Sequence, residues 1–169
     1  MPSPADAAPT EPHATPADAP TAPLEVREDI AAGFELSLTV VVRPDADAYT
    51  RELVRTTLEG KRWPGNATRA ASVAAILIDN AVRHGAVFPD GTVSLRLAVD
   101  ADTRELAIEV EDASHEFPGF AGATQRNDGR TPNGLWWVAQ YKGRLSWTVT
   151  KDDDAQTVGK RVQVILPAY

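Results

Sequence analysis

Asn80 and His84 are the first residues whose types and spacing suggest chemistry. They stand four positions apart near the end of the segment Ile76-Leu77-Ile78-Asp79-Asn80-Ala81-Val82-Arg83-His84-Gly85. A helix would place both on one face, one turn apart. A buried amide without a hydrogen-bond partner costs about 1–3 kcal/mol, so an asparagine here needs one. Either Asn80 bonds a neighbouring carbonyl while His84 caps the helix end, or both residues face a ligand.

Two further motifs stand where regular structure gives way to a loop. Asp112 ends the alternating segment Ile108-Glu109-Val110-Glu111-Asp112. Its carboxylate either closes a turn or accepts a hydrogen bond from a ligand amine. Asn133-Gly134-Leu135 stands where a long segment containing glycine and proline meets a short predicted helix. Free N–H groups at a helix start, approached closely over glycine, can bind phosphate, but neither motif identifies a ligand by itself.

Hydrophobic periodicity predicts the elements that must position these residues. Period-2 alternation predicts strands over 34–42, 93–99, 106–110, 144–150 and 161–166. Helical spacing predicts one helix from after Asp45 to about Glu59, a second from Asn66 to His84, and a short one over 134–141. The order of these elements predicts an α+β fold: a two-layer α/β sandwich with helices on one face of a mixed, mostly antiparallel sheet.

The chain divides by composition at about residue 30. Residues 1–30 hold prolines at positions 2, 4, 9, 12, 16, 20 and 23 among alanine, threonine and acidic residues. Such a segment has little to bury and is predicted to be a disordered tail. Residues 31–169 are predicted to form one domain, because a core of that size buries most of its apolar surface.

Charge and composition exclude several functions. The formal charge of −7 disfavours non-specific binding to nucleic acid or to an anionic membrane. The chain has no cysteine, which excludes disulfides and thiolate zinc sites. Its aspartates 152–154 are interpreted as a solvated hairpin link rather than a metal site. The start lacks a secretory signal and no apolar run is long enough to span a bilayer, so a cytoplasmic protein is expected.

Taken together and in this order, the motifs resemble those of the histidine-kinase-like (GHKL) ATPase superfamily. Residues 78–85 resemble its asparagine box, residues 110–114 its aspartate box, and residues 133–138 the glycine-rich box after its lid. Residues 159–167 are similar to its last strand. The resemblance covers about Phe34 to Pro167 and is nearest to actinobacterial anti-sigma-factor-like regulatory ATP-binding proteins. It implies the Bergerat-type ATP-binding fold.

The resemblance also implies a site for ATP and Mg²⁺. Asn80 would bind Mg²⁺ through its side-chain oxygen, a hard ligand of the kind that this ion prefers. Asp112 would accept a hydrogen bond from the adenine amino group, and amides near Gly134 would face the phosphates. Residues 113–133 would act as a lid. The implied nucleotide-binding set is Asn80, Arg83, His84, Asp112, Ser114, Asn133, Gly134 and Leu135.

Departures from the family pattern bear on activity. Catalytic relatives carry a glutamate four residues before the box asparagine, and that position here is Ile76. An aliphatic side chain cannot accept a proton, and general-base help is typically worth about 10²–10⁴ in rate, so no catalytic residue is assigned. Ser114 and Pro132 stand where relatives have glycine. Arg161 replaces a threonine that helps to hold adenine, which weakens the expectation of tight ATP binding.

These observations favour an ATP-binding regulatory protein of the anti-sigma-factor type, with weak or absent serine/threonine kinase activity. The expected partner is a protein such as a sigma factor or an anti-sigma-factor antagonist, and a homodimer is compatible with the sequence. Two alternatives stay open: an active serine/threonine kinase that uses another base, and a nucleotide-free protein-interaction module. Trp136, Trp137 and Trp147 either pack in the core or form a partner-binding surface.

Overall fold

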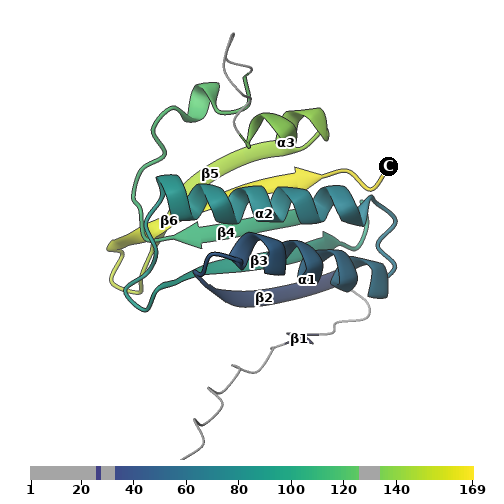
Figure 1. Ribbon diagram of the computed structural model, residues 1–169, viewed down its shortest axis with the longest axis horizontal. Helices are drawn as coiled ribbons and strands as arrows, with labels where there is room; N and C mark the ends of the chain where they lie inside the picture. The colour runs from purple at the N-terminus through teal and green to yellow at the C-terminus, as the bar shows by residue number, and fades with distance from the viewer. Residues whose placement is uncertain (1–25, 28–32, 126–133) are drawn as a thin grey trace, which may run out of the picture.

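An antiparallel sheet forms one layer of the fold (Figure 1). The computed structural model describes residues 26–27, 33–125 and 134–169. Its six strands follow the order β1-β2-β3-β4-β6-β5. Their bounds are Val26–Arg27 (β1), Gly33–Val41 (β2), Thr92–Asp100 (β3), Leu106–Asp112 (β4), Arg144–Lys151 (β5) and Thr157–Leu166 (β6). Every pairing among these strands is antiparallel, where the prediction allowed a mixed sheet.

Two long helices form the second layer. Helices α1 (Ala46–Gly60) and α2 (Ala67–His84) lie side by side over one face of the sheet, and α3 (Trp136–Gln140) lies near β5 (Figure 1). A 3₁₀ turn, Phe120–Gly122, interrupts the segment between β4 and α3. The predicted α+β two-layer sandwich is therefore confirmed.

The core lies between α2 and the central strands. Strand alternation buries one face of β3 and β4, and small residues on α2 let its backbone approach that face closely. The buried residues of the two strands and of the helix stripe are Val93, Leu95, Leu97, Val99, Leu106, Ile108, Val110, Ala70, Val73, Ala74, Leu77, Ile78 and Ala81. This packing fixes the rotation of α2, and with it the direction in which Asn80 points.

The opposite face of the sheet is polar. Glu109 is buried there and accepts hydrogen bonds from Arg96 at 2.9 Å and from Gln163 at 2.6 Å. Arg161 lies on the same face and bonds Glu111. Because side chains alternate along a strand, the residues on either side of Arg161 point toward the helices instead.

The boundaries of two predicted segments need comment. The last strand begins at Thr157 rather than at Arg161, so Gly159 and Lys160 belong to β6. At the other end, Val26–Arg27 forms β1 and pairs with residues 35 and 36 of β2. The remainder of the predicted tail lies outside the described residues, and the domain boundary at residue 30 stays a prediction.

The described ranges contain neither a membrane-spanning helix nor a cluster of metal-ligating side chains. No helix there is long and apolar enough to cross a membrane. No group of three or more histidine, aspartate or glutamate side chains in those ranges could hold a metal ion.

The cap of α2 should contribute measurably to stability. The Asn66 side chain accepts a hydrogen bond from the Arg69 backbone N–H at 2.9 Å, whereas Asp45 at the start of α1 makes no such bond. We expect Asn66→Ala to lower the free energy of unfolding by about 1 kcal/mol, and Asp45→Ala to lower it by less. Urea denaturation of both variants measures the difference. Equal losses would contradict the assigned cap.

Candidate functional site

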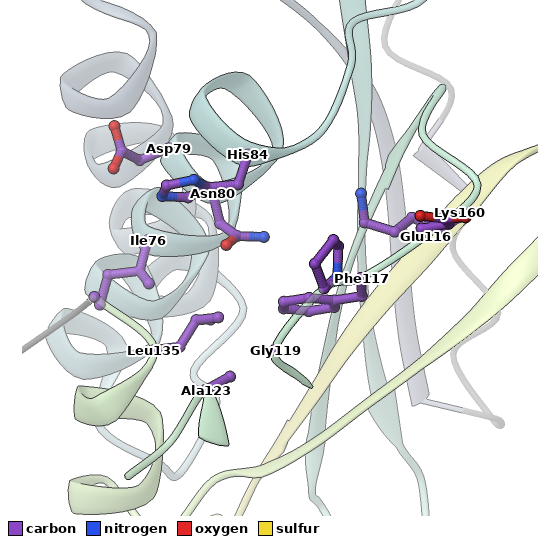
Figure 2. Close-up of a pocket in the computed structure, with 12 residues that line it drawn as sticks. Ile76, Asp79, Asn80, His84, Glu116, Phe117, Gly119, Ala123, Leu135 and Lys160 are labelled. Atoms are coloured by element: carbon purple, nitrogen blue, oxygen red, sulfur yellow. The ribbon is translucent and has the colours of Figure 1, made fainter. Parts of the chain in front are cut away.

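A cavity of about 390 Å³ lies between α2, the segment that follows β4, and the start of α3. Figure 2 shows the side chains around it. Its lining comes from four parts of the chain: Ile76, Asp79, Asn80 and His84 of α2; Glu116, Phe117, Pro118, Gly119 and Ala123 after β4; Gly134 and Leu135; and Lys160 of β6. The asparagine and glycine motifs, recognised separately in the sequence, therefore line the same cavity.

Asn80 presents its amide to this cavity. Figure 2 shows the amide directed into the hollow and the Asp79 carboxylate directed away from it. Asp79 instead accepts a hydrogen bond from Arg83 at 2.6 Å. The half-buried Asn80 amide makes no hydrogen bond to any residue that the structure describes. The interpretation in which Asn80 bonds a neighbouring carbonyl is therefore wrong.

The predicted nucleotide-binding residues on α2 differ in their placement. His84 lies at the last position of the helix and lines the cavity, although it is exposed. Arg83 is not part of the lining, and its side chain is 71% exposed.

Gly134 brings the start of α3 against α2. A Cβ atom added at Gly134 would lie 3.0 Å from the Cγ2 of Ile76, so a larger residue would need one of the two segments to move. Ile76 stands at the position where catalytic relatives carry glutamate. It lies at the cavity wall and makes an apolar contact with Gly134. Leu135 is buried beside it.

The predicted helix over 134–141 is shorter than expected. Only Trp136–Gln140 is helical, and a helix of five residues carries little of the dipole on which the phosphate argument rested. Asn133 lies outside the described residues. At this motif the backbone of Gly134 lies close to Ile76 of α2. The helix that follows is too short for its terminus to provide an anion site.

Asp112 lies at the junction of β4, β6 and α2. It is opposite Lys160 in the β4–β6 register. Its two carboxylate oxygens each accept a hydrogen bond from the Lys160 ammonium at 2.8 Å, and one of them accepts a third from the Ser114 backbone N–H at 2.8 Å. The Asp112 side chain is 0% exposed and that of Lys160 is 2% exposed. This is a fully buried ion pair.

Gly85 places the end of α2 directly against the carboxylate. A Cβ atom at position 85 would lie 2.6 Å from the Asp112 Oδ2 atom. The Ala113 backbone N–H also donates to the Ala86 carbonyl at 2.7 Å. The asparagine and aspartate motifs are therefore in contact, as the resemblance implies. Asp112 is nevertheless absent from the cavity lining, and the lining residue there is Lys160.

The residue of β6 that lines the cavity is Lys160, not Arg161. Arg161 was expected to disturb the adenine position, but it lies on the opposite face of the sheet and bonds Glu111. Lys160 is the residue that reaches the cavity. A signal for this was present, because Val162, Val164 and Leu166 alternate inward, and extending that pattern back by two residues gives position 160.

The segment after β4 adds aromatic walls that the motifs did not indicate. The Phe117 ring centroid lies 5.2 Å from that of Phe120 and 6.2 Å from that of Trp147. The Lys160 Nζ atom lies 6.0 Å from the Phe117 centroid, within range of a cation–π contact. Ser114 holds the turn below them, since its hydroxyl donates to the Glu116 carbonyl at 3.1 Å. One side of the cavity is thus apolar and aromatic.

Comparison with known proteins adds a fold-level similarity. No family model matches the chain, and no curated protein matches it. Among solved structures, the chain is similar to the histidine kinase domain of the blue-light activated histidine kinase from Erythrobacter litoralis EL346, with 22% identity and a TM-score of 0.41. The match covers 60% of this chain and 44% of that one, so the chain spans less than half the length of that structure. At this level the similarity says nothing about the site.

Breaking the buried pair should be costly. Removing one partner leaves an uncompensated buried charge, so we expect Lys160→Met or Asp112→Asn alone to lower the free energy of unfolding by about 3–5 kcal/mol. The double variant should lose less than the sum of the two. The matched control is Arg161→Met, on the same strand but partly exposed, for which about 0–1 kcal/mol is expected. Equal losses for Lys160→Met and Arg161→Met in urea denaturation would contradict the assignment.

Proposed function

We propose that this chain is a nucleotide-binding regulatory protein of the anti-sigma-factor type, which binds a protein partner and has weak or absent serine/threonine kinase activity. The observation that carries the proposal is the unpaired Asn80 amide, directed into a cavity that Gly134 also lines and that ends beside the contact between Gly85 and Asp112. ATP with Mg²⁺ is the ligand that the motif resemblance implies.

The size and lining of the cavity support a small ligand. A volume of about 390 Å³ lies within the usual range for ligand pockets, which combine apolar walls with a few convergent polar groups. Ile76, Phe117 and Leu135 supply apolar wall, and the polar groups come from Asn80, His84, Glu116 and Lys160. The lining therefore fits a ligand with one flat apolar part and one polar part.

Asn80 is suited to Mg²⁺ that arrives with phosphates. Mg²⁺ in nucleotide sites commonly takes one or two protein oxygens, with the remaining ligands from phosphates and water. A single amide oxygen without another partner meets that requirement. When bound, the ion would neutralise phosphate charge, and Asn80 would fix the position of the ion.

No carboxylate that the structure describes is placed to act as a general base at Asn80, and His84 lies one helical turn away in the cavity lining. Ile76 fills the expected position, and the Asp79 carboxylate is turned away and paired with Arg83. Glu116 also lines the cavity, but Figure 2 shows it beside Lys160, across the hollow from Asn80. The proposed function therefore includes weak or absent phosphotransfer to serine or threonine, because the glutamate of catalytic relatives is missing.

Exposed aromatic side chains support a protein partner. Trp137 is 43% exposed, although its ring lies 4.7 Å from Trp136 and 6.1 Å from Tyr141. Tryptophan and tyrosine are enriched in the centres of protein interfaces. Of the tryptophans weighed from the sequence, Trp147 packs against the core and Trp137 does not, so α3 is the proposed contact surface. The identification of the partner as a sigma factor or its antagonist comes from the resemblance.

The second candidate is a nucleotide-free interaction module. The buried Lys160–Asp112 pair favours it, because the carboxylate that would accept the adenine amino group is already hydrogen-bonded.

Calorimetric titration with nucleotide and Mg²⁺ separates these two candidates. We expect saturable binding that Mg²⁺ strengthens. Losing a hydrogen-bonding ligand to a charged group is worth about 1.5–3 kcal/mol, so Asn80→Ala should remove about tenfold or more of the Mg²⁺-dependent affinity. Arg83→Ala is the matched control on the same helix and should bind as the wild type does. The absence of heat at millimolar nucleotide would favour the interaction module.

Phosphotransfer needs its own test. Incubation of the protein with γ-labelled ATP and candidate antagonist proteins should leave serine and threonine essentially unlabelled, because Ile76 stands where catalytic relatives carry glutamate. Transfer of label to a partner, lost in Asn80→Ala, would contradict the proposal and favour the active kinase.

A further inference from the structure

We infer that Lys160 reads the nucleobase, so that the cavity selects a 6-oxopurine, such as guanine or hypoxanthine, over adenine. This inference rests on the proposed nucleotide site. It follows from three features of the base end of the cavity: the hydrogen bonds of the Lys160 ammonium, the saturation of the Asp112 carboxylate, and the ring of Phe117.

The first feature is a hydrogen-bond donor that Asp112 does not use. A lysine ammonium has three N–H donors and no acceptor. Two of them face the Asp112 oxygens at 2.8 Å each. Lys160 also lines the cavity while being almost fully buried. A ligand at this wall therefore meets an N–H donor held in place by a carboxylate.

The second feature is that Asp112 has no free direction toward a ligand. Its oxygens accept from Lys160 and from the Ser114 backbone N–H, and Gly85 packs against Oδ2. An adenine amino group directed at this wall would face the ammonium, donor against donor. To reach Asp112 it would first have to displace a buried cation from the carboxylate with which it is paired.

A 6-oxopurine has the complementary edge. Guanine presents O6 and N7 as two adjacent acceptors, and lysine is a common partner of that edge, whereas adenine presents N7 beside an amino donor. Phe117, whose centroid lies 6.0 Å from Nζ, offers a ring face on which a base can stack. Because Lys160 pairs with Asp112, the group that faces the base is a hydrogen-bond donor rather than an acceptor.

The size of the preference can be bounded. Sites built to hydrogen-bond one group reject an analogue that lacks it by up to about 10⁴–10⁵. Adenine keeps the N7 acceptor, so a smaller factor of about 10 to 100 is expected here.

The test compares inosine triphosphate with ATP on the full wild-type chain, each with Mg²⁺, by calorimetry. Both nucleotides lack a 2-amino group and carry the same sugar and phosphates, so they differ only at the 6-position and at the adjoining N1, which is a donor in hypoxanthine and an acceptor in adenine. We expect inosine triphosphate to bind about 10- to 100-fold more tightly, and GTP to bind more tightly than ATP as well. Equal binding, or a preference for ATP, would overturn the inference.

Variants assign the preference to the pair. The combined change Lys160→Met with Asp112→Asn should abolish the preference, because an asparagine amide both donates and accepts. Arg161→Met should retain it. Circular dichroism checks that each variant is folded, and the wild-type comparison stands without them. A preference that survives in the double variant would overturn the role of Lys160.

The outcomes separate the two proposals. Mg²⁺-dependent binding that is sensitive to Asn80→Ala but favours ATP overturns the base preference alone. No binding of any of the three nucleotides overturns the nucleotide site and the base preference together.

Discussion

The buried ion pair between Lys160 and Asp112 is the interaction on which the geometry of this site depends. It joins the ends of two neighbouring strands, and the same carboxylate accepts the N–H of Ser114 at the start of the following segment. Gly85 lets the end of α2 rest on it. Two charges taken out of water cost several kcal/mol each unless they are paired and hydrogen-bonded, so strand, helix and loop are held to one arrangement around this contact. The packing of α2 on β3 and β4 sets the direction of Asn80, and the pair lies against the end of that helix at Gly85.

The same pair determines what the cavity can recognise. A free carboxylate at this position would accept a hydrogen bond from an amine. In the ion pair, Lys160 is the group that a ligand at this wall meets. At the other end, Ile76 replaces a proton acceptor with an aliphatic contact to Gly134. In the described part of the chain, the site thus has groups suited to holding a ligand and an aliphatic side chain where catalytic relatives carry glutamate. This arrangement suits the proposed function, which is nucleotide binding with weak or absent phosphotransfer.

Much of the fold could be predicted from local patterns. Asn66 caps α2 as expected, and the alternation from Val93 to Val99 and from Leu106 to Val110 marks two buried strand faces. The convergence of the asparagine and glycine motifs on one cavity could be predicted only by resemblance. The number of residues between two motifs does not determine how far apart they lie in the folded chain.

Lys160 was missed because β6 was predicted to begin at Arg161, one residue after it, although the inward alternation of Val162, Val164 and Leu166 continues back to position 160. Its pairing with Asp112 depends on the β4–β6 register, which local sequence does not encode. The central claim, that Asp112 is neutralised by a buried ammonium, can be measured directly by NMR of the side-chain NH₃⁺ groups in the ¹⁵N-labelled protein. The account predicts one ammonium signal protected from exchange with water at neutral pH, which disappears in Asp112→Asn and persists in Glu111→Gln. A spectrum in which every lysine ammonium exchanges rapidly, as exposed ones do, would contradict it.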